Sequence, residues 1–141
     1  MKGPIQSLEV SYIVHATEDG DKVEEAVAGL FGFLDRGEVD RLEGHFGNEI
    51  IRVAHHVTGK DAEAAFSALV AKMPPRLREQ LRGELAQHLD EHSVFYVRLD
   101  KQKLLDGEPA LAGSDPVRVR VKPRLITLKG SAASLFGRLL S

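Results

Sequence analysis

Hydrophobic and polar residues alternate along several stretches of the chain, a pattern typical of strands with one covered face. In the first stretch, residues 8–14, the apolar side is formed by Leu8, Val10, Tyr12 and Val14. The other strands are predicted near residues 39–42 and at residues 50–57, 94–99 and 117–125. We expect the strand at residues 94–99 to lie at or near the centre of its sheet.

Elsewhere, apolar residues recur at intervals of three and four, the spacing of a helix with one buried face. This spacing predicts helices over residues 23–34, 62–73 and 75–89, and a short amphipathic tail over residues 131–141. Thr17, Asp19 and Asp21 can each cap the first helix, Thr58 has the spacing of a capping box for the second, and Pro75 can begin the third. The order of elements predicts one α+β domain over residues 1–141, with a single mixed or largely antiparallel sheet. Its helices would pack on one face and leave the other face free.

The composition is that of a soluble globular domain. The chain has 141 residues, of which 43% are hydrophobic and 28% are charged, and it has no cysteine. A chain of this size can bury enough surface to fold without a disulfide or a metal, so a secreted disulfide scaffold is excluded. Its apolar runs are far shorter than the ~20 residues of a membrane helix, and no apolar leader precedes the first strand. We therefore expect a cytoplasmic protein with no membrane partner.

Charge is distributed unevenly along the chain, although the net charge is only −2. Residues 1–70 hold 6 Lys/Arg against 13 Asp/Glu, a net of −7, whereas residues 71–141 hold 13 against 8, a net of +5. The last segment, residues 116–141, contains cations and no acid. Because local potential rather than total charge attracts a ligand, a polyanion is the natural partner of this segment. The alternative is an ordinary solvated face.

The strand at residues 117–125 carries the most informative pattern. Alternation sends its valines to the core and a row of four cations to the opposite face: Arg118, Arg120, Lys122 and Arg124. Side chains two apart on a strand lie ~6.6 to 6.8 Å apart, close to the rise of two nucleotides at ~3.4 Å each. The row can therefore follow a phosphate backbone. The alternative is an edge strand protected by charge against aggregation.

Two further strands carry polar or aromatic side chains that could extend this row. Tyr96 and Arg98 share a face of one strand, and Arg52 and His56 share a face of another. If these faces coincide with the cationic row, an aromatic ring or a guanidinium plane can stack on an unpaired base. The alternative is that Tyr96 belongs to the core, with its hydroxyl at the rim. Lys101, just beyond the strand, offers a donor to phosphates or sugar hydroxyls.

The segment Gly44-His45-Phe46-Gly47-Asn48 has glycines on both sides of His45 and Phe46. This favours a tight loop that holds functional side chains clear of the sheet, with His45 and Asn48 as candidate contacts to a nucleic acid. The segment lacks the spacing and the Lys-Ser/Thr end of a phosphate loop. A plain hairpin turn is the alternative.

An enzyme and a protein-interaction module are the alternative functions. A metal-dependent nuclease or phosphoesterase could draw its ligands from His15, His45, His55, His56, Glu18 and Asp19. None of these has a diagnostic spacing, and the adjacent positions 55 and 56 of a strand point to opposite faces. No serine–base pair, cysteine nucleophile or dinucleotide-type glycine loop stands out. In an interaction module, tail residues would dock on a partner or a second copy instead of covering the domain's own core; these are Leu135, Phe136, Leu139 and Leu140.

Three segments have a distinctive order that spans most of the chain: His15-Ala16-Thr17-Glu18-Asp19, Glu43-Gly44-His45-Phe46-Gly47-Asn48 and Arg98-Leu99-Asp100-Lys101-Gln102. Together they resemble an archaeal family of predicted exosome-associated RNA-binding proteins. The chain departs from the family at Glu49, where the family usually has Pro. The resemblance implies a small α+β fold, similar to that of a large-subunit ribosomal protein that binds the smaller RNA of that subunit. It also implies RNA binding without known catalysis, and proximity to the exosome.

We therefore hypothesise a non-catalytic RNA-binding protein that needs no cofactor and acts in RNA processing or degradation. The candidate RNA-binding residues are Arg118, Arg120, Lys122, Arg124, Arg98, Lys101, Tyr96, His45, Asn48 and Arg52. The partners would be RNA and exosome subunits, and the oligomeric state is left open. Because stacking groups are useful only to unpaired bases, single-stranded or looped RNA is favoured over a duplex.

Overall fold

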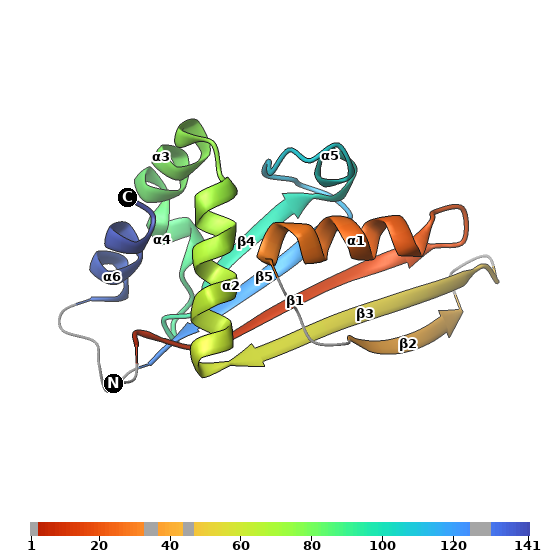
Figure 1. Cartoon of the computed structure of the whole chain (residues 1–141), viewed down its shortest axis with the longest axis horizontal. Coiled ribbons are helices and arrows are strands. Elements are labelled where there is room, and N and C mark those ends of the chain that lie inside the picture. The colour runs from red at the N-terminus through yellow and green to blue at the C-terminus, as the bar shows by residue number, and fades with distance from the viewer. Residues whose placement is uncertain (1–2, 33–36, 44–46, 125–130) are drawn as a thin grey trace.

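The computed structural model of the chain describes residues 3–32, 37–43, 47–124 and 131–141. In these residues five strands form one sheet: β1 (Ile5–His15), β2 (Glu38–Glu43), β3 (Glu49–Thr58), β4 (Phe95–Asp100) and β5 (Pro116–Pro123). The strand order is β2-β3-β1-β5-β4, and every neighbouring pair is antiparallel (Figure 1). The predicted α+β fold with a largely antiparallel sheet is therefore confirmed.

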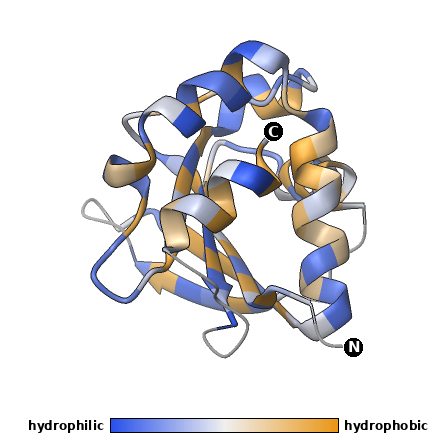
Figure 2. Ribbon diagram, turned by 90° about the vertical axis from the view of Figure 1, so that its left-hand side faces the viewer, coloured by the Kyte–Doolittle hydropathy of each residue, from blue (hydrophilic) through white to orange (hydrophobic). Residues whose placement is uncertain are grey.

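Six helices pack against the sheet in the described residues: α1 (Gly20–Phe31), α2 (Gly59–Lys72), α3 (Pro75–Gly83), α4 (Leu85–His88), α5 (Lys101–Leu105) and α6 (Ala132–Leu139). Asp19 caps α1, because its carboxylate accepts hydrogen bonds from the amides of Asp21 and Lys22 at 3.1 and 3.4 Å. Thr58 is the N-cap residue of α2, but its side chain makes no capping hydrogen bond. Figure 2 shows the helices above the sheet, with hydrophobic and hydrophilic residues alternating along the strands.

The core lies between the sheet and the helices, and three phenylalanines from α2, β4 and α6 meet in it. The rings of Phe95 and Phe136 stack with their centroids 4.9 Å apart, and Phe66 meets both of them edge-on. Leu135, Phe136 and Leu140 are buried. The C-terminal tail therefore covers the domain's own core and does not offer these side chains to a partner.

β4 lies at an edge of the sheet, so the expectation of a central or near-central strand is wrong. Its apolar residues resemble those of a central strand, since Phe95, Val97 and Leu99 are all fully buried. Its outer edge is also covered, because Leu89 forms a bridge with Phe95 and Leu111 forms one with Leu99. A covered edge needs no charge or proline to block further pairing, which explains the apolar composition of this edge strand.

The helix predicted over residues 75–89 is two helices in the structure. α3 ends at Gly83, a residue with low helix propensity, and Glu84 (φ −116°, ψ 22°) separates it from α4. α1 ends at Phe31, α2 at Lys72 and β5 at Pro123, each earlier than predicted. Residues 33–36 and 125–130 lie outside the described part of the chain.

Candidate nucleic-acid interface

We call the face of the sheet opposite the helices the open face. The strand registers bring together on it side chains from all five strands: Glu38, Asp40 and Leu42 of β2, Ser7, Glu9, Ser11 and Ile13 of β1, Arg52, Ala54 and His56 of β3, Tyr96 and Arg98 of β4, and Arg118, Arg120 and Lys122 of β5. None of the six described helices covers this face (Figure 2). The predicted free face of the sheet is therefore present, and the candidate cations of three strands lie on it.

The cationic row of β5 consists of Arg118, Arg120 and Lys122, which are exposed on the open face. The valines between them point to the core and are fully buried. β5 lies between β1 and β4, inside the sheet. The alternative of an edge strand protected by charge is therefore wrong, because β5 has no free edge to protect.

Two arginines of this surface lie directly opposite each other on neighbouring strands. Arg98 of β4 pairs in register with Arg118 of β5, and both side chains are exposed. Like charges placed directly opposite in a sheet repel and destabilise it. Neither guanidinium has an ion-pair partner among the described residues. An anion bound between them would relieve this repulsion.

Arg120 is held between an aromatic ring and an acid. Its guanidinium carbon lies 5.4 Å from the centre of the Tyr96 ring, and Nη1 lies 4.0 Å from Oε1 of Glu9. Glu9 is the one acid that the described residues bring within ion-pair distance of the cationic row, and this contact is solvent-exposed and weak. The Tyr96 hydroxyl donates to Oδ2 of Asp90 at 3.0 Å. Tyr96 is half-buried on the open face, so it is not a core residue with only its hydroxyl at the rim.

Arg52 joins the same surface from β3. β1 separates β3 from β5, and on β1 the small side chain of Ser11 lies opposite both Ala54 and Arg118. Arg52 and Arg118 line one hollow of about 250 Å³ together with Ser11 and Asp115. The candidate arginines on β3, β4 and β5 therefore do share one surface.

Arg124 does not belong to the cationic row, contrary to the prediction. Its Nε donates to the carbonyl of Gly3 at 3.1 Å and its Nη2 donates to the carbonyl of Ile5 at 3.4 Å. Its own amide donates to the carbonyl of Pro4 at 2.7 Å. Arg124 is half-buried and ties the end of β5 to the start of β1. Its guanidinium therefore has a structural role.

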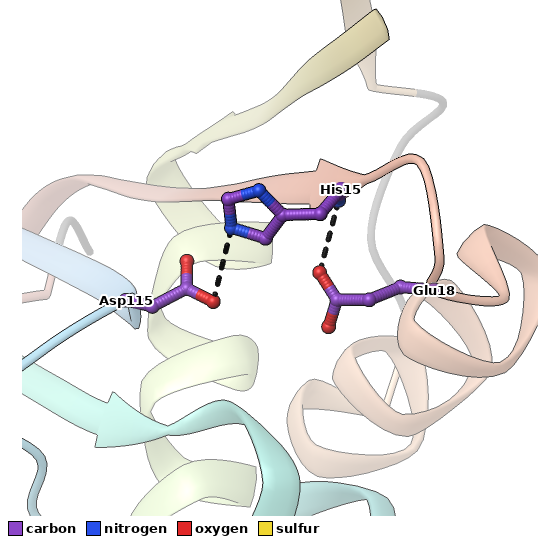
Figure 3. A group of neighbouring side chains, drawn as sticks. All are labelled: His15, Glu18 and Asp115. Carbon is purple, nitrogen blue, oxygen red and sulfur yellow. Dashed lines mark hydrogen bonds and ion pairs between the residues drawn. The ribbon is translucent and has the colours of Figure 1, made fainter. Parts of the chain in front are cut away.

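Lys101 is also occupied within the protein. Its side chain is only 2% exposed, and its ammonium contacts the carbonyl of Ile13 at 2.7 Å and carboxylate oxygens of Glu18 and Asp115 at 2.8 Å each. His15 completes this cluster: its Nε2 lies 3.2 Å from Asp115, and its amide donates to Glu18 at 2.9 Å (Figure 3). The prediction that Lys101 donates to RNA does not fit this burial.

The Lys101 cluster joins two of the segments that carry the family resemblance. Gln102 donates to Oε2 of Glu18 at 3.2 Å, next to the Lys101 contact. Burial raises the pKa of Glu18, but hydrogen bonds from Lys101 and the His15 amide outweigh this and lower the pKa below its usual value. Burial likewise raises the pKa of Asp115, and Lys101 and His15 lower it overall. Sequence reasoning missed Asp115, which no local pattern marks.

Of the predicted metal ligands, the structure brings together only His15 and Glu18 among the described residues. His55 is buried, with its Nε2 3.4 Å from the Tyr12 hydroxyl, whereas His56 is exposed on the open face. In the described residues, one set of three potential ligands clusters within 4.8 Å: His15, Glu18 and Asp115. The Lys101 ammonium already lies against both carboxylates and supplies the compensating positive charge. The cluster is therefore an internal ion-pair network centred on the Lys101 ammonium.

The loop between β2 and β3 is described only in part. Asn48 is exposed, and Gly47 has a φ of +77°, which favours glycine. His45, a predicted RNA contact, and Phe46 lie outside the described residues. Glu49, which stands where the similar family usually has Pro, forms an ion pair with Arg41 of β2 at 2.7 Å.

Within the described ranges, no helix is both long enough and apolar enough to cross a membrane.

Comparison with known proteins identifies relatives over nearly the whole chain. A family model described as "RNA binding" matches residues 7–123. The RNA-binding protein PAB1135 of Pyrococcus abyssi is 34% identical over 94% of this chain and 92% of its own length. The uncharacterized protein MJ0213 of Methanocaldococcus jannaschii is 33% identical over 89% of each chain.

Solved structures of archaeal proteins have the same fold. The protein AF2318 from Archaeoglobus fulgidus, a DUF54 family member, superposes with a TM-score of 0.80 at 29% identity, over 96% of this chain and 99% of its own. Mth689 from Methanothermobacter thermautotrophicus, also a DUF54 protein, superposes with a TM-score of 0.72 at 24% identity, over 99% of this chain and 100% of its own. At that identity the second likeness concerns the fold alone.

Proposed function

We propose that this chain, which belongs to the RNA-binding protein family, binds RNA across the open face of its sheet. The model of that family matches residues 7–123. Phosphates would lie along the cationic row and beside Arg98 and Arg52. The relative from Pyrococcus abyssi, which is named an RNA-binding protein, supports this reading.

The observation that carries the proposal is the cross-strand pair of Arg98 and Arg118. Its two exposed guanidinium groups lie opposite each other, and no acid of the described residues lies within ion-pair distance of either. A protein gains nothing in stability from such a pair, because the two charges repel. A phosphate between them can accept hydrogen bonds from both guanidinium groups, for which phosphate is a well-matched acceptor.

We further propose that the RNA is single-stranded or looped and that the protein neither cleaves it nor needs a cofactor. Tyr96 and Arg120 place an aromatic ring and a guanidinium plane together on the open face. Such flat groups stack on bases that are not already paired. Incubating labelled RNA with the purified protein and Mg²⁺, Mn²⁺ or Zn²⁺ should leave the RNA intact. Cleavage that persists through repeated purification would refute the non-catalytic role.

Binding should be measured by fluorescence anisotropy with an unstructured oligoribonucleotide at several salt concentrations. Five cations on the open face can each neutralise one phosphate: Arg52, Arg98, Arg118, Arg120 and Lys122. At a slope of about 0.7 per phosphate for a single strand, affinity should fall about a hundredfold between about 50 mM and about 200 mM salt. A salt-insensitive complex would refute phosphate binding.

A pair of double variants locates the interface. Arg98→Gln/Arg118→Gln should reduce the salt slope by about 1.4, since two phosphate contacts are lost. The control is Arg76→Gln/Arg82→Gln, which removes the same charge from exposed positions on α3, on the helix side of the sheet. It should leave the slope unchanged, because distant charges are screened beyond about 10 Å at moderate salt. Equal losses in both variants would refute a specific role for the open face.

We also propose that this RNA binding serves RNA processing or degradation in contact with the exosome. This extension is supported only by the resemblance carried by residues 15–19, 43–48 and 98–102. Co-purification with exosome subunits that survives nuclease treatment would support a physical contact. Co-purification lost on nuclease treatment would mean that RNA alone bridges them and would refute the protein contact.

A further inference from the structure

A hollow of about 570 Å³ lies between α4, the outer edge of β4 and residues 111–112. We call it the β4 hollow; its walls include Gln87, Leu89, Asp90, Tyr96, Arg98 and Leu111. We propose that the β4 hollow binds one unpaired nucleobase of an RNA strand whose phosphates lie along the open face. This inference rests on the proposed function and adds a base-binding subsite to it.

The hollow is continuous with the cationic surface, because two residues belong to both. Tyr96 and Arg98 stand on the open face of β4 and also line the hollow. Arg98 lies opposite Arg118, and Tyr96 lies opposite Arg120. An RNA strand whose phosphates lie at these arginines would therefore run along the rim of the β4 hollow. One base turned away from the RNA backbone at this point would enter the hollow.

The walls of the hollow suit a base better than a phosphate. Leu89 and Leu111 supply apolar surface, and the Asp90 carboxylate repels a phosphate but can accept a hydrogen bond from the amino group of a base. Desolvation raises the pKa of Asp90, but hydrogen bonds from the Val94 amide and the Tyr96 hydroxyl outweigh it and lower the pKa, so the group is charged at neutral pH. The side-chain amide of Gln87 has no partner among the described residues and can both donate and accept.

The ring of Tyr96 is fixed before any ligand arrives. Its hydroxyl donates to Asp90 at 3.0 Å, and Arg120 lies over the ring at 5.4 Å. Its backbone carbonyl accepts a hydrogen bond from Nδ1 of His88 at 2.9 Å. A stacking group held in this way loses little conformational freedom on binding, which favours affinity. The volume of the hollow also falls within the range of small-molecule sites, about 300 to 1,000 Å³.

The test compares one oligoribonucleotide with an abasic oligomer of the same length and charge, using the unmodified protein and fluorescence anisotropy. Stacking contributes roughly a 5- to 150-fold gain in affinity for one base. We expect the abasic oligomer to bind at least about fivefold more weakly. Equal affinity for the two would overturn the base subsite and leave phosphate binding intact. Failure of both oligomers to bind would overturn the proposed function as well.

A variant that fills the β4 hollow tests whether the affinity difference between the two oligomers arises there. Ala112→Phe places a ring in the β4 hollow, whereas Ala86→Phe adds the same ring at an exposed position of α4 that does not line it. The first should weaken binding of the intact RNA at least about fivefold and leave binding of the abasic oligomer unchanged. The second should change neither. Full affinity of a folded Ala112→Phe protein for the intact RNA would overturn the proposal.

A second measurement uses the unmodified protein, so it does not depend on whether Ala112→Phe folds. An oligoribonucleotide containing 4-thiouridine is crosslinked by light, and the attached peptide is identified by mass spectrometry. Attachment within residues 87–98 or 111–112 is expected. Attachment only at other residues would overturn the assignment of the base to the β4 hollow.

Discussion

Replacing the buried lysine at position 101 should destabilise the fold at neutral pH by about 3 kcal/mol. Lys101→Met keeps the length of the side chain and removes the ammonium. That ammonium contacts the Ile13 carbonyl and the carboxylates of Glu18 and Asp115 at 2.7 to 2.8 Å. The variant therefore leaves two carboxylates without their main counter-charge.

The size of this loss in free energy of unfolding depends on the solvent exposure of each carboxylate that loses its counter-charge. Removing one partner of a buried ion pair costs about 3 to 5 kcal/mol. The Glu18 side chain is 15% exposed and bears most of this cost, whereas the Asp115 side chain is 43% exposed and keeps His15 at 3.2 Å. The lower end of the range therefore applies. For a domain of this size, the melting temperature should fall by about 10 °C.

The effect should also depend on pH, with a sign that the structure fixes. The pKa values of Glu18 and Asp115 are lowered in the folded protein from ordinary values of 4.5 and 3.8. At a pH above these ordinary pKa values, the ionised carboxylates therefore stabilise the fold. This stabilisation is lost as the pH falls through the lower pKa values of the folded protein. Because Lys101 is a principal cause of the lowering, the difference between wild type and variant should shrink in this acidic window.

Urea unfolding at neutral and acidic pH measures the free energy of unfolding of each protein. Lys103→Met, an exposed position on the same helix, is the control and should change stability by less than about 0.5 kcal/mol. Adding Glu18→Gln to Lys101→Met should recover part of the loss, since no buried charge is then abandoned. A loss as small as that of the control, or one that does not shrink in acid, would refute the assignment.

Three further outcomes are expected. Arg124→Ala should lower the free energy of unfolding by about 1.5 to 3 kcal/mol, because the Arg124 guanidinium holds the start of β1. It should leave the salt slope of RNA binding unchanged. A reduced slope would show that Arg124 contacts RNA as part of the cationic row. Phe95→Ala should cost about 3 to 5 kcal/mol in urea unfolding, because it breaks the stack with Phe136, and a loss near zero would contradict the packing. Burial, with a smaller effect of Glu24, raises the pKa of Tyr12 to about 12. Its ultraviolet absorbance should therefore change only near that pH, and stability should fall as pH rises from about 10 towards it. Titration of Tyr12 near pH 10 in the folded protein would contradict this.

Local alternation was enough to predict which side chains share a face of each strand. It placed Arg118, Arg120 and Lys122 opposite the valines and Tyr96 beside Arg98, because the period of two is a property of the strand itself. It could not give the order of the strands, which depends on contacts between distant segments. For that reason β4 was expected near the centre, although Leu89 and Leu111 cover it at an edge.

The same limit explains why the sequence did not reveal the internal partners of two predicted RNA-binding cations. Lys101 contacts Glu18, 83 residues earlier in the chain, and Arg124 contacts Gly3 and Ile5, 121 and 119 residues earlier. A sequence pattern shows that these side chains are charged, but it does not show which of them find partners across the fold. Exposed and internally paired cations look alike until the strand order is known.

The position of β5 inside the sheet has a consequence for the kinetics of association. Its backbone is hydrogen-bonded on both sides, to β1 and to β4, so its charged side chains stand on a rigid support. A protein that holds its docking surface in one shape changes little between its free and bound forms. The ordering entropy on binding would then be lost by the RNA, and association should be fast and limited by diffusion and electrostatic attraction.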